Sequence, residues 1–254
     1  MIRVKIKLCL IILLNLGISG CGSDNPEVTR FEARAVMPMA TIEPGEHALS
    51  LGGPLLINGT ISWRDGILYI PRVSQSKESL PLLVWLHGGG GRASDIRYMF
   101  PLAEEHGVVI LTLDARHNTW DGIDSPFGPD VQFIDAALRH TFKRVAIDPA
   151  RIGLGGLSDG ASYALAIGRS NGDLFSHLIA VAPWFLTPPS PPIGQPAIYV
   201  AHGIRDNVYN FRVSRHLTVP RLRDAGYDVT YLEFDGPHWV PEPVANELLK
   251  WLKH

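Results

Sequence analysis

The sequence predicts an α/β fold in which a mostly parallel sheet is covered by helices on both faces. Short apolar runs alternate with longer amphipathic runs along most of the chain. The short runs are almost continuously apolar, as expected for strands that are buried on both faces. Hydrophobic residues make up 46% of the 254 residues and charged residues 19%, an ordinary composition for a globular protein with one sizeable core.

The predicted elements follow one another from residue 66 to residue 252. The expected strands are 66–70, 80–86, 108–113, 151–157, 177–182, 197–201 and 227–234. The expected helices are 94–106, 129–145, 159–170, 213–225 and 241–252, the first of which is closed by Gly107. Between the strands 177–182 and 197–201, the proline-rich stretch 188–192 leaves too few residues for a helical lid. We therefore expect no sizeable lid domain.

The start of the chain follows a different pattern. Arg3, Lys5 and Lys7 precede an almost wholly apolar run, 8–18. As a helix this run would rise about 16 Å, roughly half of the hydrocarbon core of a bilayer. A charged start, a short apolar run and small residues after it are typical of a secretory signal peptide, here residues 1–20.

The signal peptide is followed by a cysteine in a suggestive context. The residues Ile-Ser-Gly-Cys at 18–21 resemble the lipobox of bacterial lipoproteins. That resemblance implies cleavage before Cys21, lipidation of its thiol, and an exported protein anchored in the membrane of the cell envelope at its periplasmic or outer-membrane face. The alternative is an uncleaved membrane anchor with an incidental cysteine. Residues 21–46 are polar and rich in Pro and Glu, so we expect a lipidated N-terminus and tether, followed by the main domain at 47–254.

Composition also excludes several classes of partner. The formal net charge is −2 and no basic stripe is present, so we expect no nucleic acid. The only cysteines are Cys9 and Cys21, so a chain cleaved before Cys21 can form no internal disulfide. The sequence contains no H-E-x-x-H motif and no cysteine pairs, so we expect no metal and no cofactor.

A serine lies at the junction of a predicted strand and a predicted helix. Residues 156–160, Gly-Leu-Ser-Asp-Gly, match the G-x-S-x-G elbow of serine hydrolases. The nucleophile of such an elbow has a strained backbone, and its neighbours two residues away must be tiny. Gly156, Gly160 and Ala161 meet that requirement. The pattern predicts Ser158 as a nucleophile; the alternative is a serine that caps a helix after a glycine-rich turn.

A serine hydroxyl needs a base, and the base needs an acid that orients it. Of ten histidines, only His238 lies in the loop directly after the last predicted strand. Asp206 follows the preceding strand, and the order Ser, Asp, His is that of α/β-hydrolases. Asp235 is the rival acid, but it lies only three residues before His238 and is poorly placed to reach the outer ring nitrogen. The prediction is a triad of Ser158, His238 and Asp206.

A glycine run after the strand 80–86 is a candidate oxyanion hole. Residues 87–91 read His-Gly-Gly-Gly-Gly, which lets the backbone approach a substrate oxygen closely. We expect the N–H of Gly89, ahead of that of Gly90, as one donor and the N–H of Asp159, at a helix N-terminus, as the other. A phosphate cradle is disfavoured because no Lys-Ser/Thr pair and no G-x-G-x-x-G pattern follows.

At these motifs the chain resembles the esterase and carboxylesterase branch of the α/β-hydrolases, including polyhydroxybutyrate-depolymerase-like and phospholipase/carboxylesterase-like proteins. The resemblance covers roughly residues 64–254. It rests on Leu-His-Gly-Gly-Gly at 86–90, Asp-Pro-Ala-Arg-Ile at 148–152 leading into the elbow, and His202-Gly203 with Asp206 and His238. It implies an α/β-hydrolase fold that cleaves carboxylic esters through an acyl-enzyme. Many relatives carry Gln, Ala or Met at the position of Asp159, and a carboxylate there would disfavour anionic substrates.

The substrate site and two alternative functions remain open at this point. Four aromatic residues fall on loops at the edge where the candidate triad lies: Trp120, Trp184, Phe185 and Trp239. They either line an apolar pocket for a small-molecule or polymeric ester, or they pack under the loops. A serine peptidase of the same fold ranks lower, because no gating domain is present to select peptides. A non-catalytic envelope lipoprotein that binds a ligand would not need nucleophile, base, acid and oxyanion loop together.

Overall fold

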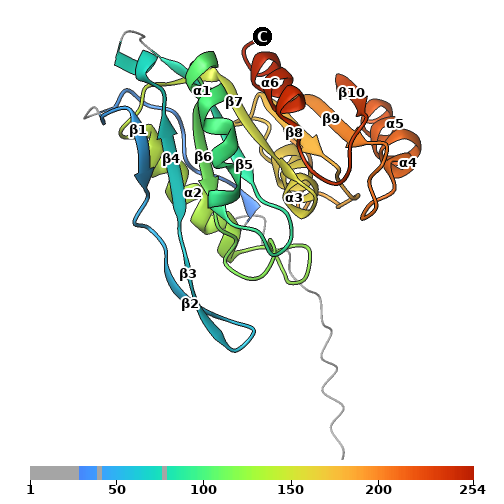
Figure 1. Ribbon diagram of the computed structural model, residues 1–254, viewed down its shortest axis with the longest axis horizontal. Coiled ribbons are helices and arrows are strands. Elements are labelled where there is room, and N and C mark those ends of the chain that lie inside the picture. Colours follow the sequence, from blue (N-terminus) through green and yellow to red (C-terminus); the bar gives the residue numbers. More distant parts are fainter. Residues whose placement is uncertain (1–28, 39–41, 76–78) are drawn as a thin grey trace, which may run out of the picture.

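An eight-stranded sheet forms the centre of the computed structural model, which describes residues 29–38, 42–75 and 79–254 (Figure 1). In spatial order its strands are β1 (Gly45–Ala48), β4 (Gly66–Ile70), β6 (Val109–Leu113), β5 (Leu80–Leu86), β7 (Ile147–Leu157), β8 (His177–Val181), β9 (Ala197–Gly203) and β10 (Val229–Phe234). From β6 to β10 all neighbours are parallel, whereas β4 is antiparallel to both β1 and β6. The predicted mostly parallel sheet is confirmed.

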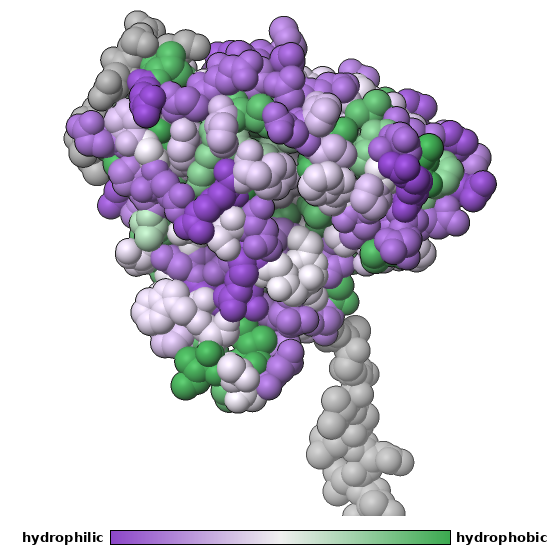
Figure 2. Space-filling model, viewed as in Figure 1, coloured by the Kyte–Doolittle hydropathy of each residue, from purple (hydrophilic) through white to green (hydrophobic). Residues whose placement is uncertain are grey.

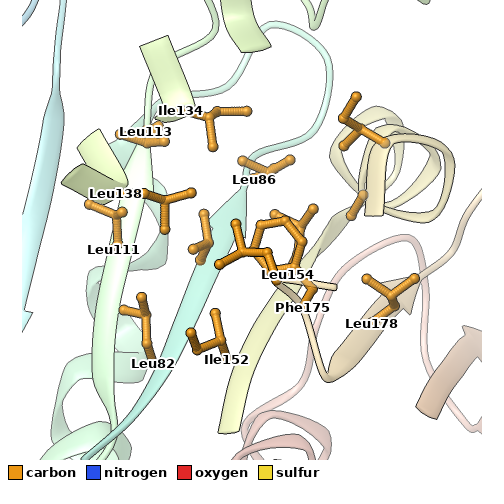
Figure 3. Packing of buried hydrophobic residues seen from close by; sticks show 14 of the residues in the cluster. Leu82, Leu86, Leu111, Leu113, Ile134, Leu138, Ile152, Leu154, Phe175 and Leu178 are labelled. Carbon is orange, nitrogen blue, oxygen red and sulfur yellow. The ribbon is translucent and has the colours of Figure 1, made fainter. Parts of the chain in front are cut away.

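Helices cover both faces of the sheet. Residues of α2 (Pro129–Phe142), α3 (Asp159–Arg169) and α5 (Val219–Asp224) belong to one buried apolar cluster, and those of α1 (Phe100–His106) and α6 (Glu242–Trp251) to another. Strand β5 contributes Leu82, Val84 and Leu86 to the first cluster and Leu83 and Trp85 to the second. Alternate side chains of a strand point to opposite faces, so one apolar strand supports two cores. Figure 3 shows the first cluster at close range.

Two predicted helices differ from the observed ones at proline residues. The helix predicted over 94–106 is a 3₁₀ segment, Ala93–Met99, followed by α1 with Pro101 in its first turn. The helix predicted over 213–225 begins with the short α4 (Phe211–Val213) and a π-helical turn, Ser214–Thr218, and continues as α5 with Pro220 in its first turn. Proline has no N–H to donate, so it fits the first turn of a helix better than its interior.

Within the predicted tether, residues 21–46, the segment 29–34 packs against the domain, which a free tether would not do. Phe31 and Ala33 are 1% and 2% exposed, and the Phe31 ring packs edge-on against Phe175 at 5.6 Å. Strand β1 also starts at Gly45, before the predicted domain boundary at residue 47. The polar composition hid an alternation of buried and exposed residues over 29–34. The predicted signal peptide and Cys21 lie outside the described residues, and no helix within the described ranges has the length and hydropathy needed to cross a bilayer.

A projecting β-hairpin was not predicted. Strands β2 (Gly53–Ile57) and β3 (Thr60–Arg64) form a separate antiparallel ribbon joined by Asn58 and Gly59, both with positive φ. The Asn-Gly dipeptide between two apolar runs is the sequence signal of such a turn. Leu56 and Ile61 pair across the ribbon and are 71% and 76% exposed. Figure 2 shows apolar residues at the end of this hairpin, away from the body of the fold.

Candidate active site

Ser158 occupies a sharp turn between β7 and α3. Its backbone has φ 58° and ψ −120°, a strained combination for a residue with a side chain. The turn is held by a hydrogen bond from the Ser158 N–H to Val181 O at 2.9 Å. The glycine loop, residues 87–91, passes directly beside it, since a Cβ built on Gly88 would lie 3.3 Å from Ser158 Cβ. The structure therefore gives Ser158 the strained backbone that the sequence predicted.

Two glycines allow this turn to press against the end of β5. A Cβ on Gly160 would lie 2.3 Å from Leu86 O and 2.5 Å from His87 O. A Cβ on Gly156 would lie 2.5 Å from Leu86 O. Backbone oxygens of a central strand cannot move aside as a flexible side chain would. The small residues that the elbow motif requires are thus needed here for packing against the sheet.

We expect Gly160→Ala to destabilise the protein by about 3 kcal/mol or more, because its methyl group overlaps two backbone carbonyls. Gly53→Ala is the matched control: its new Cβ would meet nothing within 4 Å, so the change should stay within about 1 kcal/mol. Chemical denaturation of both variants measures the difference. Equal stabilities would contradict the close approach of the elbow to β5.

Asp206 and His238 are brought together by the loops after β9 and β10. The N–H groups of Ile204 and Arg205 donate to Phe234 O and Gly236 O at 2.9 and 3.0 Å, which ties the two loops to each other. His238 Nδ1 then lies 2.6 Å from Asp206 Oδ2. This is the short distance expected when a carboxylate accepts from an imidazole.

The Asp206 carboxylate is held in its ionised form. Its side chain is fully buried, and its second oxygen accepts the N–H groups of Val208 and Tyr209, each at 2.8 Å. Burial on its own would raise the pKa of Asp206, but the hydrogen bonds from His238, Tyr209 and Val208 outweigh it and lower the pKa. The rival Asp235 is 70% exposed and pairs with Arg205, and among the described residues no hydrogen bond or ion pair joins it to His238.

His202 is a site residue whose role sequence reasoning missed. Its fully buried ring places Nε2 3.1 Å from both Asp206 Oδ2 and Tyr209 O, and Nδ1 2.8 Å from Ser214 Oγ. Because both partners of Nε2 are acceptors, Nε2 carries the proton and Nδ1 accepts from the serine hydroxyl. Burial lowers the pKa of His202, which favours this neutral form. The sequence offered one signal, its position at the end of a strand four residues before Asp206.

Tyr209 lies between the two halves of the site and was also missed. Its ring is edge-on to the His238 ring, with centroids 5.4 Å apart, and its hydroxyl donates to Asp159 Oδ1 at 3.1 Å. Burial and the Asp159 carboxylate raise the pKa of Tyr209, while a hydrogen bond with the Ser158 side chain opposes that shift. Within the described residues no direct hydrogen bond joins Ser158 to His238. No sequence motif marks Tyr209.

The backbone N–H of Gly89, in the glycine loop, is free at the expected place. The N–H of Gly90 already donates to Asn118 O at 2.9 Å, and that of Gly91 donates to Gly88 O at 3.0 Å. In the part of the chain that the structure describes, the N–H of Gly89 has no acceptor, and neither has that of Asp159 at the start of α3. The choice of Gly89 over Gly90 therefore fits the geometry.

The four aromatic candidates for a substrate pocket have different surroundings. Trp120 is fully buried and donates its indole N–H to His87 O at 2.8 Å, so its assignment to a pocket is wrong and it packs beneath the glycine loop. The guanidinium carbon of Arg221 lies over the Phe185 ring, 4.9 Å from the centroid of that ring. Trp184 and Trp239 are 50% and 54% exposed.

Two further carboxylates near the site are structural. Asp121 and Asp130, 4% and 1% exposed, accept hydrogen bonds from each other's backbone N–H groups. Asp121 also accepts from the Tyr163 hydroxyl, and burial raises the pKa of Asp130 to about 6. These bonds fix the loop before α2. Among the described side chains, no group of three or more His, Cys, Asp or Glu is arranged to hold a metal ion.

Comparison with solved structures identifies the architecture. Esterase PE8 aligns with a TM-score of 0.61 and 21% identity, over 75% of this chain and 98% of that chain. A fluorophosphonate-binding serine hydrolase F of Staphylococcus aureus gives 0.64 and 12%, over 84% and 100%. A Bacillus cereus carboxylesterase gives 0.55 and 18%, over 75% and 93%.

The chain has the α/β-hydrolase fold. No family model matches the sequence, and no curated protein matches it either. At identities this low, the structural likeness concerns the fold, and the chemistry has to be argued from the site itself.

Proposed function

We propose that this α/β-hydrolase fold protein is a serine hydrolase that cleaves carboxylic esters, with Ser158 as nucleophile, His238 as base and Asp206 as orienting acid. The observation that carries the proposal is the strained turn of Ser158 at the same sheet edge as the 2.6 Å contact between His238 and Asp206. The backbone conformation of Ser158, between a strand and a helix, has a functional explanation at a nucleophile elbow. The resemblance of the solved neighbours, which include esterases, supports the same reading.

In the proposed reaction, Ser158 Oγ attacks the ester carbonyl carbon while His238 Nε2 takes its proton. Asp206 accepts the Nδ1–H of His238, which leaves Nε2 free to act as a base and stabilises the imidazolium. The N–H groups of Gly89 and Asp159 receive the oxyanion. His238 then protonates the departing alcohol, and water, activated by the same imidazole, releases the acid from Ser158.

The proposal requires Ser158 and His238 to come into direct contact during catalysis. Catalytic hydrogen bonds are often long in the free enzyme and tighten when substrate binds. His238 follows β10 in a short loop, its side chain is 15% exposed, and Tyr209 contacts both residues.

A fluorophosphonate probe tests the nucleophile directly, because it phosphonylates only an activated serine. We expect stoichiometric labelling of the folded protein and, after digestion, a mass shift on the peptide that contains Ser158. The heat-denatured protein is the control and should remain unlabelled, since its serines have no base. A label on another residue, or no label on the folded protein, would refute the assignment.

A substrate panel then separates the two kinds of acyl transfer. Short-chain p-nitrophenyl esters should be hydrolysed far faster than peptide p-nitroanilides of matched acyl group. A serine peptidase would cleave the anilides as well, because it can protonate and expel an amine, so anilide hydrolysis at a substantial rate is the result that would favour a peptidase. The 15 residues between β8 and β9 carry no helix that could form a gating lid, which fits an ester substrate that reaches the site from solvent.

A further inference from the structure

The carboxylate of Asp159 has an unusual position for a charged group. It belongs to the residue directly after Ser158, and both of its oxygens accept from neutral hydroxyl groups: Oδ2 from Thr119 at 2.7 Å and Oδ1 from Tyr209 at 3.1 Å. Among the described residues, no lysine, arginine or histidine forms an ion pair with it. A carboxylate can accept about four hydrogen bonds, so acceptor capacity remains.

This carboxylate borders the place where the oxyanion is expected. A Cβ built on Gly89, the proposed donor, would lie only 2.5 Å from Asp159 Oδ2. A fixed negative charge there opposes the negative charge that develops on the substrate oxygen. A substrate that brings its own positive charge to Asp159 would remove that disadvantage, whereas a neutral ester would not.

Aromatic rings line the same side of the site. Tyr209, whose hydroxyl binds Asp159, has its ring centroid 5.7 Å from that of Trp184. Trp184 is 50% exposed, so one of its surfaces is open to a ligand. Ring faces of Trp and Tyr attract ammonium groups through their quadrupoles. A carboxylate beside two aromatic rings, one of them half-exposed, is a chemical environment suited to an organic cation.

We propose that Asp159, with Tyr209 and Trp184, binds an ammonium group of the substrate beside the scissile bond, so that the preferred substrates are cationic esters. This inference rests on the proposed ester hydrolase function and narrows its substrate class. The ammonium group stays bound throughout and takes no part in the bond changes. Its positive charge offsets the charge of Asp159 while the oxyanion forms.

The test compares two thioesters of nearly identical shape. Acetylthiocholine carries a quaternary nitrogen where 3,3-dimethylbutyl thioacetate carries a carbon atom, so the ratio of their kcat/KM values isolates the charge. We expect a ratio of about ten or more at low ionic strength, decreasing as salt is added. Asp159→Asn should bring the ratio close to one. Trp184→Leu, at a half-exposed position, should lower it by about two- to five-fold.

Thr119→Val is the matched control for a purely structural role of Asp159. It removes a hydroxyl donor to the carboxylate but keeps the charge, so the ratio should persist even if both rates change. If Asp159 only ties loops together, Asp159→Asn and Thr119→Val would lower both thioester rates in parallel and leave the ratio unchanged. That result would overturn the inference.

The failure of this inference can be distinguished from failure of the proposed function. Equal rates for the two thioesters in the unmodified protein, together with fluorophosphonate labelling of Ser158, would refute the cation site and leave the hydrolase. If neither thioester is hydrolysed, calorimetric titration with tetramethylammonium tests whether the cation site exists. Saturable binding that Asp159→Asn abolishes would support the cation site, and no binding would refute it.

Discussion

Ser158→Ala is expected to lower kcat for p-nitrophenyl esters by about 10⁵- to 10⁶-fold, because the acyl-enzyme can no longer form. The methyl group of alanine fits the same turn, whose N–H bond to Val181 O involves only the backbone. The melting temperature should therefore change little. Stopped assays over hours are needed to measure the residual rate, which comes from the oxyanion donors and substrate binding alone.

Ser162→Ala provides the matched control for this variant. Ser162 lies one turn further along α3 and is also buried, and its hydroxyl donates to Ser158 O at 3.0 Å. It also accepts the backbone N–H of Trp184 at 2.8 Å. It has no role in proton transfer, so we expect a loss of at most about ten-fold, consistent with two missing hydrogen bonds. If Ser158→Ala kept activity comparable to that of Ser162→Ala, Ser158 could not be the nucleophile.

Asp206→Asn is expected to lower kcat by about 10⁴-fold while the protein stays folded. The two oxygens of Asp206 have separate partners: Oδ1 accepts two backbone N–H groups, and Oδ2 accepts from His238 and His202. Asparagine has one oxygen. If that oxygen keeps the backbone bonds, the amide NH₂ faces His238 Nδ1, which must then accept. The proton moves to His238 Nε2, where the base is needed.

The same substitution places two donors, the new amide and His202 Nε2–H, opposite each other. We therefore expect a loss of stability of about 1–3 kcal/mol in addition to the kinetic defect. Asp235→Asn is the control, since this exposed residue pairs with Arg205 and should keep full activity. Steady-state kinetics and chemical denaturation of both variants measure these effects. A large kinetic defect in Asp235→Asn alone would exchange the roles of the two acids.

The sequence determined the order of the elements and the edge of the sheet where the site lies. Buried strands are recognisable by continuous apolar runs such as Leu80–Leu86, and the carboxyl ends of parallel strands share one edge. Ser158, Asp206 and His238 each follow such a strand, so their meeting at one edge could be expected. The sharp turn at Ser158 was predictable because its glycines, strand and helix are adjacent in the chain.

Contacts between distant segments were decided only by the tertiary structure. The partners of Asp206 depend on the parallel pairing of β9 with β10, in which His202 lies opposite Glu233, and on loops some thirty residues apart. That pairing buries His202 against the acid and turns Tyr209 toward both His238 and Asp159. Phe31 is likewise buried by contacts with Asn171 and Phe175, which lie more than a hundred residues away in the sequence. Periodicity reports which face of its own segment a residue occupies, and it carries no information about what that face will meet.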